Sequence, residues 1–233
     1  MSEPFSIVAA GDSAVVVRFD ERVDPVVNTR AVSLAAGLAA EQLGGVRDVV
    51  PAFCSVTVYF DPLTTDASRL MDCLQRLATE DVSAASATGA LIDIPVCYGG
   101  DLGPDLLALA AFARLPELEV VQLHAAVTYH VFMIGFTPGF PYLGIVDDRI
   151  AMPRRQTPRT RVPAGSVGIA GRQTGIYPTD SPGGWQLIGR TPLKVFDLGR
   201  QPPFLLRAGD LVRFAPINRT QFDAVAAASG SGR

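Results

Sequence analysis

The first part of the chain alternates between strand-like and helix-like hydrophobic patterns. Residues 14–19 (AVVVRF) are rich in β-branched side chains, which favour a strand. The pair Asp24–Pro25 is a typical helix start, because aspartate caps the first turn and proline suits its backbone geometry. Apolar residues then recur at helical spacing until Gly44 and Gly45. These patterns predict a strand followed by a helix.

The next stretches complete an α+β pattern. Residues 46–50 and 55–60 predict two strands, a second helix begins near Thr65, and residues 90–97 predict a further strand. The predicted order β-α-β-β-α-β is typical of a ferredoxin-like unit. Residues 79–89 (TEDVSAASATG) are small and polar, which indicates a linker.

The second half of the chain has a different pattern. Two short helical patches and one strand come first, and many short apolar runs separated by glycine and proline follow. The helical patches are residues 106–112 and 117–123, the strand is 128–134, and the runs are 167–170, 175–177, 185–188, 193–196 and 211–214. Short strands with frequent turn residues predict an all-β barrel or sandwich.

These patterns divide the chain into three parts. We expect an α+β domain over residues 1–85, a β-rich domain over residues 90–220, and a disordered tail over residues 221–233. No repeat of fixed period is visible in the sequence.

Composition and charge restrict the classes of partner. The 233 residues are 48% hydrophobic and 18% charged, which is typical of a globular protein. A net charge of −3 gives no electrostatic reason to expect nucleic acid or an anionic membrane. The sequence has no apolar run of about 20 residues and no basic segment before an apolar stretch at its start, so we expect a cytoplasmic protein. Its three cysteines are scattered, which indicates reduced thiols and no metal site.

Residues 162–192 (VPAGSVGIAGRQTGIYPTDSPGGWQLIGRTP) combine many glycines with aromatic and arginine side chains. A P-loop requires G-x-x-x-x-G-K-[ST], and a dinucleotide fingerprint requires G-x-G-x-x-G between a strand and a helix; neither is present. The glycines are better explained by barrel corners and by close approach of backbones or of a ligand.

Two neighbouring segments offer candidate binding groups. The run GFTPGFPYLG at 135–144 is either a rigid aromatic plug or the rim of a preorganised pocket. The run PRRQTPRTRVPAG carries four arginines without an acid, and it is either a solvated face or a site for carboxylate or phosphate oxygens. The sequence has no G-x-S-x-G or H-E-x-x-H motif, and His124 and His130 are its only histidines.

The segments IPVCYGG, GFTPGFPYLG, TPRTRVPAGSVGIAG, QTGIYP and SPGGWQLIGRTPLKVFD occur in this order. Together with GDSAVVVRF and VVPAFCSVTVYFDP, they resemble the B subunits of bacterial ATP-dependent 5-oxoprolinases, a family also described as allophanate hydrolase subunit 1 or KipI. The resemblance covers nearly the whole chain.

The resemblance implies an α+β fold, with an N-terminal ferredoxin-like domain followed by a C-terminal cyclophilin-like β-barrel. It implies that the chain works with subunits C and A to open the lactam of 5-oxo-L-proline to L-glutamate with ATP. Because the sequence shows no P-loop and no complete set of nucleophile and base, we expect the chain to be inactive alone. Two alternatives remain: a carboxyltransferase component of a urea-type biotin-dependent carboxylase, and a histidine-kinase inhibitor of the KipI type.

We place candidate roles on matching positions. Arginines would hold the substrate carboxylate or a transferred phosphoryl group, Gln173 and Tyr177 would hydrogen-bond the ring amide, and Trp185 would form an apolar wall. The candidate catalytic residues are His124, Arg161, Gln173 and Tyr177, and the candidate substrate-binding residues are Phe136, Pro138, Phe140, Arg159, Arg172, Trp185 and Arg190.

Overall fold

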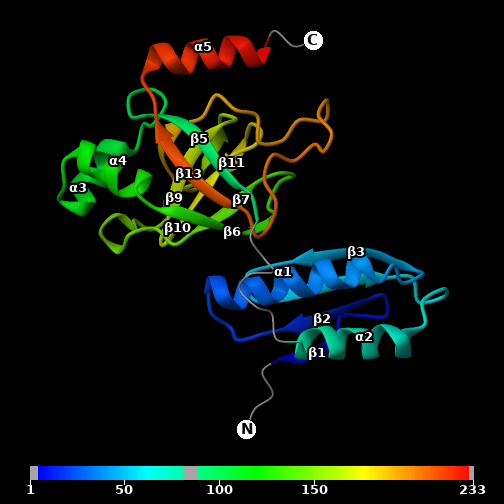
Figure 1. The fold of residues 1–233 in the computed structure, drawn as a ribbon. Coiled ribbons are helices and arrows are strands. Elements are labelled where there is room, and N and C mark those ends of the chain that lie inside the picture. The colour runs from blue at the N-terminus through cyan, green and yellow to red at the C-terminus, as the bar shows by residue number, and fades with distance from the viewer. Residues whose placement is uncertain (1–4, 81–88, 231–233) are drawn as a thin grey trace. The chain divides into compact units, whose positions relative to one another are not determined.

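The computed structural model describes residues 5–80 and 89–230, which form two compact units (Figure 1). The units divide between Gly89 and Ala90. Most of the expected linker, residues 81–88, lies outside the described residues.

The first unit is a four-stranded antiparallel sheet packed against two helices. Its elements are β1 (Ser6–Ala9), β2 (Ala14–Arg18), α1 (Pro25–Ala40), β3 (Val46–Pro51), β4 (Ser55–Phe60) and α2 (Ala67–Thr79). The strand order is β1-β2-β4-β3. The helix starts follow the expected chemistry, because the side chains of Asp24 and Asp66 accept hydrogen bonds from Val26 N and Arg69 N. Buried apolar residues of the central strands and of both helices form its core.

The expected β-α-β-β-α-β order is wrong in its last strand. Residues 91–98 form a barrel strand of the second unit, and β1 supplies the fourth strand of the first sheet instead. The β1 strand has only four residues and pairs with β2 across a turn at Gly11, where the backbone has a φ of 77°. So short an apolar run gives no clear periodicity, and it was therefore not predicted.

The second unit is built on a closed seven-stranded barrel. Its strands run in the order β10-β7-β6-β13-β5-β12-β9. They are β5 (Leu91–Tyr98), β6 (Thr128–Ile134), β7 (Pro141–Gly144), β9 (Ser166–Ala170), β10 (Gln173–Ile176), β12 (Gln186–Arg190) and β13 (Leu211–Pro216). All neighbouring pairs are antiparallel except β13 and β5. The mixed α+β class with a closed barrel is therefore confirmed, and the barrel replaces the sandwich alternative.

Smaller elements surround the barrel. They are α3 (Leu106–Ala113), α4 (Glu117–Ala125), the 3-10 turn η2 (Asp148–Ile150), the two-stranded sheet of β8 (Arg159–Val162) and β11 (Ser181–Gly183), and α5 (Arg219–Gly230). The helix α5 crosses one end of the unit (Figure 1). Its Phe222 packs with Cys97 and Leu102. The disordered tail expected from residue 221 onward is therefore wrong up to Gly230, because this apolar contact anchors the helix.

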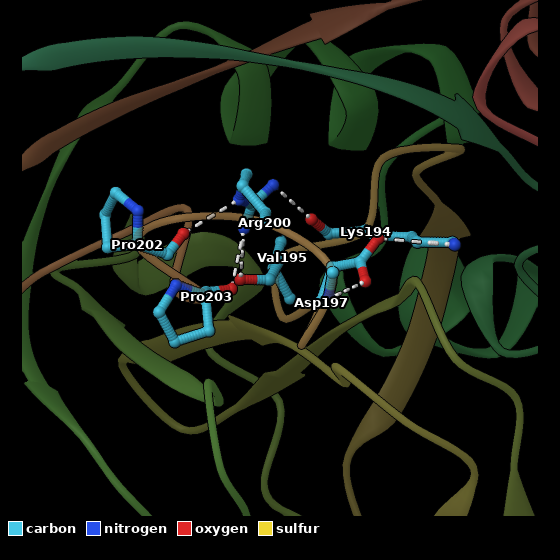
Figure 2. Close-up of polar contacts among 7 residues, drawn as sticks. Lys194, Val195, Asp197, Arg200, Pro202 and Pro203 are labelled. Atoms are coloured by element: carbon cyan, nitrogen blue, oxygen red, sulfur yellow. Dashed lines mark hydrogen bonds and ion pairs between the residues drawn. The ribbon is translucent and has the colours of Figure 1, made fainter. Parts of the chain in front are cut away.

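Residues 193–196, expected as a strand, belong instead to a loop that one arginine holds together. The Arg200 guanidinium donates hydrogen bonds to the carbonyl oxygens of Lys194, Val195, Pro202 and Pro203, at 2.9–3.4 Å (Figure 2). The carbonyl oxygens of Val195 and Pro203 also accept backbone bonds from Leu205 N and Asp197 N, and a single β-bridge joins Phe196 to Phe204. The loop is therefore held by one bridge and by Arg200, and residues 193–196 form no continuous strand.

Candidate functional site

A cavity of about 790 Å³ opens on the second unit. Its wall combines the loop after β6, the start of β7, residues 153–158, the end of β9 with the start of β10, and the segment from β11 to Trp185. The aromatic run 135–144 and the glycine-rich stretch 162–192 both contribute to it. The glycine-rich stretch is therefore barrel scaffold and cavity wall together.

One side of the cavity is an aromatic cluster around Phe140. The centroid of its ring lies 5.0 Å from Tyr142, 5.1 Å from Tyr177, 5.3 Å from Trp185 and 5.6 Å from Phe136, each in an edge-to-face arrangement. Phe140 and Tyr177 are almost fully buried, whereas Phe136 is exposed. Burial raises the pKa of Tyr177 and of Tyr142, so both phenols stay protonated at neutral pH. The cluster gives the cavity a stiff apolar wall with neutral polar tips.

The glycines of the segment PGGW make room for this wall. A Cβ atom at Gly183 would lie 2.3 Å from the hydroxyl oxygen of Tyr177, so any side chain there would displace the ring. Gly184 has space for a methyl group, but the Nε and Nη2 atoms of Arg154 would lie 3.6 Å from it. The close approach of backbone to an aromatic ring accounts for Gly183.

Arg154 is the only charged side chain of the cavity lining among the described residues. Most arginines of this unit have a partner: Arg149, Arg155, Arg159, Arg161, Arg172, Arg190, Arg200, Arg213 and Arg219 each bind a carboxylate or a carbonyl oxygen. Within residues 5–80 and 89–230, the Arg154 side chain makes neither an ion pair nor a hydrogen bond. The cavity therefore has one unpaired cation, on an exposed residue.

Two hydroxyl groups belong to lining residues and also lack partners. Thr137 Oγ1 and Ser181 Oγ are buried and make no hydrogen bond to any described residue. Leaving a buried hydroxyl unpaired costs about 1–3 kcal/mol, so such groups are uncommon without a reason.

A buried aspartate fixes the segment that carries Arg154. The Asp105 carboxylate accepts hydrogen bonds from Arg159 Nη2 at 2.7 Å, from Arg155 Nη1 at 3.3 Å and from Leu187 N at 2.7 Å. Its side chain is only 8% exposed. We call this set of four residues the Asp105 clamp. It ties residues 155–159 to β12.

Two further bonds join the same segments. Arg155 N donates to Gly184 O at 2.7 Å, and Gln186 Nε2 donates to Pro153 O at 2.8 Å. Arg154 therefore lies between two residues that are both anchored to residues 184–186. The guanidinium is held at the cavity by its neighbours, although it has no bond of its own.

The structure brings together five of the candidate residues. Phe136, Phe140, Gln173, Tyr177 and Trp185 all line the cavity. The aromatic loop is therefore both packed core and pocket rim, so a plug and a rim are not exclusive alternatives for it.

The candidate arginines lie elsewhere, each with a partner. Arg161 pairs with Asp180 at 2.6 Å, Arg172 pairs with Asp148 at 2.8 Å, and Arg190 donates to the carbonyl oxygen of Ala164 at 2.7 Å. Arg159 belongs to the Asp105 clamp. None of them is in the cavity lining, nor is the exposed Pro138.

His124 lies in the barrel core and not at the cavity. Its Nδ1 atom is 2.8 Å from Tyr98 Oη, its Nε2 atom is 2.9 Å from Thr174 Oγ1, and its ring stacks on Phe214 at 4.6 Å. Complete burial lowers the pKa of His124 to about 3. The imidazole is therefore neutral and hydrogen-bonded on both sides at neutral pH.

Thr137, Ser181 and Asp105 were not predicted from the sequence as site residues, and Arg154 was considered only as one of the four arginines of its run. Arg154 stands in the arginine run, but nothing in the run tells which arginine stays unpaired. Asp105 stands at the N-cap position of α3, and its side chain makes no capping bond there. No group of three or more metal-ligating side chains occurs in the described part of the chain, and none of its helices is long and apolar enough to cross a bilayer.

Comparison with known proteins places the chain in a family. Residues 5–206 match the family model described as the carboxyltransferase domain, subdomain C and D. The chain belongs to this family. It is 42% identical to the 5-oxoprolinase B subunit of Bacillus subtilis, over 96% of this chain and 98% of that protein. It is 45% identical to the 5-oxoprolinase B subunit of Escherichia coli O157:H7, over 88% and 93% of the two chains.

Solved structures of similar proteins agree with the fold. The crystal structure of TTHA0988 superposes with a TM-score of 0.80 at 40% identity; it covers 88% of this chain, which spans only 40% of that longer chain. The urea amidolyase of K. lactis, at 21% identity and a TM-score of 0.74, shares the fold alone. The resemblance seen in the sequence is therefore confirmed.

Proposed function

We propose that this chain is the B subunit of a 5-oxoprolinase complex and that its barrel cavity holds the lactam substrate. The observation that carries the proposal is the cavity, in which an aromatic wall meets Gln173 and the unpaired Arg154. 5-Oxoproline is a small ring with apolar methylene groups, one amide and one carboxylate, and the cavity offers groups of each matching kind. Three relatives that are named as 5-oxoprolinase B subunits support the assignment.

The chemistry explains why several chains are needed. A five-membered lactam is stable, so in the proposed reaction ATP first transfers its γ-phosphoryl group to the amide oxygen and leaves as ADP. One water then adds to the amide carbon, and the C–N bond breaks as the nitrogen takes a proton, which gives an acyl phosphate of glutamate. A second water hydrolyses the acyl phosphate to glutamate and phosphate. This chain would bind and orient the ring, exclude bulk water with its aromatic wall, and offer neutral donors from Tyr177 and Gln173 to the developing charge.

ATP is the proposed cosubstrate of the complex, and its site is assigned to the partner subunits A and C or to their junction with this chain. The sequence has no P-loop, and the cavity has a single cation, which is too few to neutralise a triphosphate. We further propose that the complex works in the cytoplasm and that this chain has no turnover by itself.

The unpaired arginine also weighs against the urea alternative. Urea is neutral, so a site for urea alone gives no role to an uncompensated guanidinium. Carboxyl transfer to urea would in addition require a biotinylated partner. No feature of the described residues favours kinase inhibition.

The test is reconstitution from purified subunits. We expect glutamate and ADP to form from 5-oxoproline and ATP when this chain is mixed with subunits A and C, and no product from this chain alone. The matched control omits only this chain. ATP-dependent glutamate formation by the isolated chain would contradict the proposal, and so would a complex that carboxylates urea but leaves 5-oxoproline intact.

A further inference from the structure

The cavity and its clamp together suggest which part of the substrate this chain recognises. A guanidinium is planar and carries five N–H donors, so it is satisfied best by a carboxylate or a similar oxyanion. In this unit the fold pairs guanidinium groups repeatedly, with Asp105 binding two of them and Asp93 and Asp101 binding one each. Arg154 has no such partner among the described residues, and it lines the cavity.

The surroundings of Arg154 give it no carboxylate partner within the described chain. The acids that hold the neighbouring arginines are engaged: Asp105 is shared by Arg155 and Arg159, and Asp180 binds Arg161. The positive charge of Arg154 lowers the pKa of Tyr142 and of Tyr177, but the larger effect on each is the rise caused by burial. Their phenols remain neutral and give Arg154 no counter-charge.

The backbone on both sides of Arg154 is fixed. Pro153 O accepts from Gln186, Arg155 N donates to Gly184, and the Arg155 side chain enters the Asp105 clamp. A cation whose main chain is held in this way loses less conformational freedom on binding an anion than one on a free loop. The arrangement is therefore a preorganised anion-binding position beside an aromatic wall.

We propose, on the basis of the function proposed above, that Arg154 binds the carboxylate of the lactam substrate and that the Asp105 clamp positions it. The cavity is then specific for small rings that carry a carboxylate. Trp185 packs in the aromatic wall and is the only tryptophan of the chain, so its fluorescence reports on ligands that enter.

The experiment combines three ligands with three arginine variants, Arg154→Leu, Arg154→Lys and Arg213→Leu. The ligands are 5-oxoproline, cyclopentanecarboxylate, which keeps the ring and charge without the amide, and 2-pyrrolidinone, which keeps the lactam without the charge. Binding is followed by Trp185 fluorescence in the isolated full chain, and KM is measured in the reconstituted complex. Arg154→Leu is compared with Arg213→Leu, whose wild-type arginine pairs with Asp93 away from the cavity.

We expect Arg154→Leu to lower the affinity for both carboxylates about 10- to 30-fold and to change the affinity for 2-pyrrolidinone by less than about 3-fold. This is the lower part of the range for a charge-assisted pair, because Arg154 is exposed. Arg154→Lys keeps the charge without the fork and should recover part of the loss. Arg213→Leu should leave the affinity for all three ligands unchanged.

Three results would overturn the inference. The first is equally weakened binding of all three ligands to Arg154→Leu, and the second is unchanged carboxylate binding to that folded variant. The third is a wild-type chain whose Trp185 fluorescence responds to neither carboxylate. The proposed function is judged separately, by glutamate formation in the wild-type complex. An active complex in which Arg154→Leu has no effect on carboxylate binding would reject only the inference. An inactive complex whose chain still binds both carboxylates through Arg154 would reject only the proposed function.

Discussion

The Asp105 clamp makes a prediction that the sequence alone would not suggest. Asp105→Asn keeps the size of the side chain and one acceptor oxygen, but removes the negative charge that two guanidinium groups share. The amide group must also place two N–H donors where Arg155, Arg159 and Leu187 already donate. We therefore expect a loss of stability and a displaced segment 153–159.

The magnitude follows from burial. Removing one partner of a buried ion pair costs about 3–5 kcal/mol. The side chains of Arg155 and Arg159 are 38% and 24% exposed, so water can solvate part of the charge left behind. We therefore reduce the estimate to about 2–4 kcal/mol. For a unit of this size that corresponds to a fall in Tm of roughly 5–15 °C.

The matched control is Asp93→Asn. Asp93 makes two bonds to Arg213 at 2.8 and 2.9 Å, but its side chain is 57% exposed. An exposed pair of this kind contributes little to stability, because water already solvates both charges, so Asp93→Asn should unfold close to the wild type. Thermal unfolding followed by circular dichroism compares the two variants with the wild type.

A second measurement separates positioning from general stability. At 25 °C, well below its Tm, the Asp105→Asn complex should show a raised KM for 5-oxoproline, because Arg154 is less well held. The reasoning is refuted if the free energies of unfolding of Asp105→Asn and Asp93→Asn differ by less than about 0.5 kcal/mol, which is the usual effect of a surface substitution. A destabilised variant with unchanged KM would leave Asp105 a structural residue only.

Two further predictions concern groups without a place in the proposed reaction. His124 has a pKa of about 3 in the folded chain and about 6.5 when unfolded, so the unfolded state binds more protons between these values and stability falls as the pH falls. From pH 6.5 to pH 5 this amounts to about 1.6 kcal/mol, which urea unfolding should detect and which His124→Gln should largely remove; an unchanged slope in that variant would assign the effect elsewhere. Ser181→Ala removes a buried hydroxyl with no partner among the described residues, so unfolding should show a neutral or slightly stabilising effect, and a cost above about 1 kcal/mol would reveal a hydrogen bond to solvent.

Much of the fold was accessible from the sequence because local signals agreed with the tertiary structure. The Asp24 cap predicted the start of α1, and the β-branched run 14–19 predicted β2. The second helix was expected near Thr65 and begins at Ala67, and the strand expected at 55–60 is β4. The errors arose where tertiary contacts decide. The sequence of residues 91–98 is compatible with a strand in either unit. Its partner strand β13 lies 120 residues later in the chain, so local sequence does not reveal which sheet it joins.

The candidate site divides in the same way. Aromatic and glycine-rich segments could be recognised because their composition is unusual for a linker, and Phe140, Tyr177 and Trp185 do meet in one wall. Which arginine binds a ligand could not be predicted from the sequence. That depends on which arginines the fold neutralises, and their partners are distant: Asp105 lies 54 residues from Arg159.

The Asp105 clamp fixes the segment that carries the unpaired Arg154. Substitutions of Asp105 and of Arg154 should therefore have coupled effects on substrate binding. If Asp105 affects the substrate only by positioning Arg154, Asp105→Asn has nothing left to disturb once Arg154 is leucine. The KM of the double variant should then equal that of Arg154→Leu within a factor of about 2, or about 0.5 kcal/mol in binding free energy. The loss in Tm caused by Asp105→Asn should persist in full. Additive effects on KM would mean that Asp105 acts through another part of the wall, such as the backbone of β12 that its carboxylate also holds through Leu187 N. The comparison thus separates two routes from one buried carboxylate to the cavity, one through the arginine segment and one through the strand.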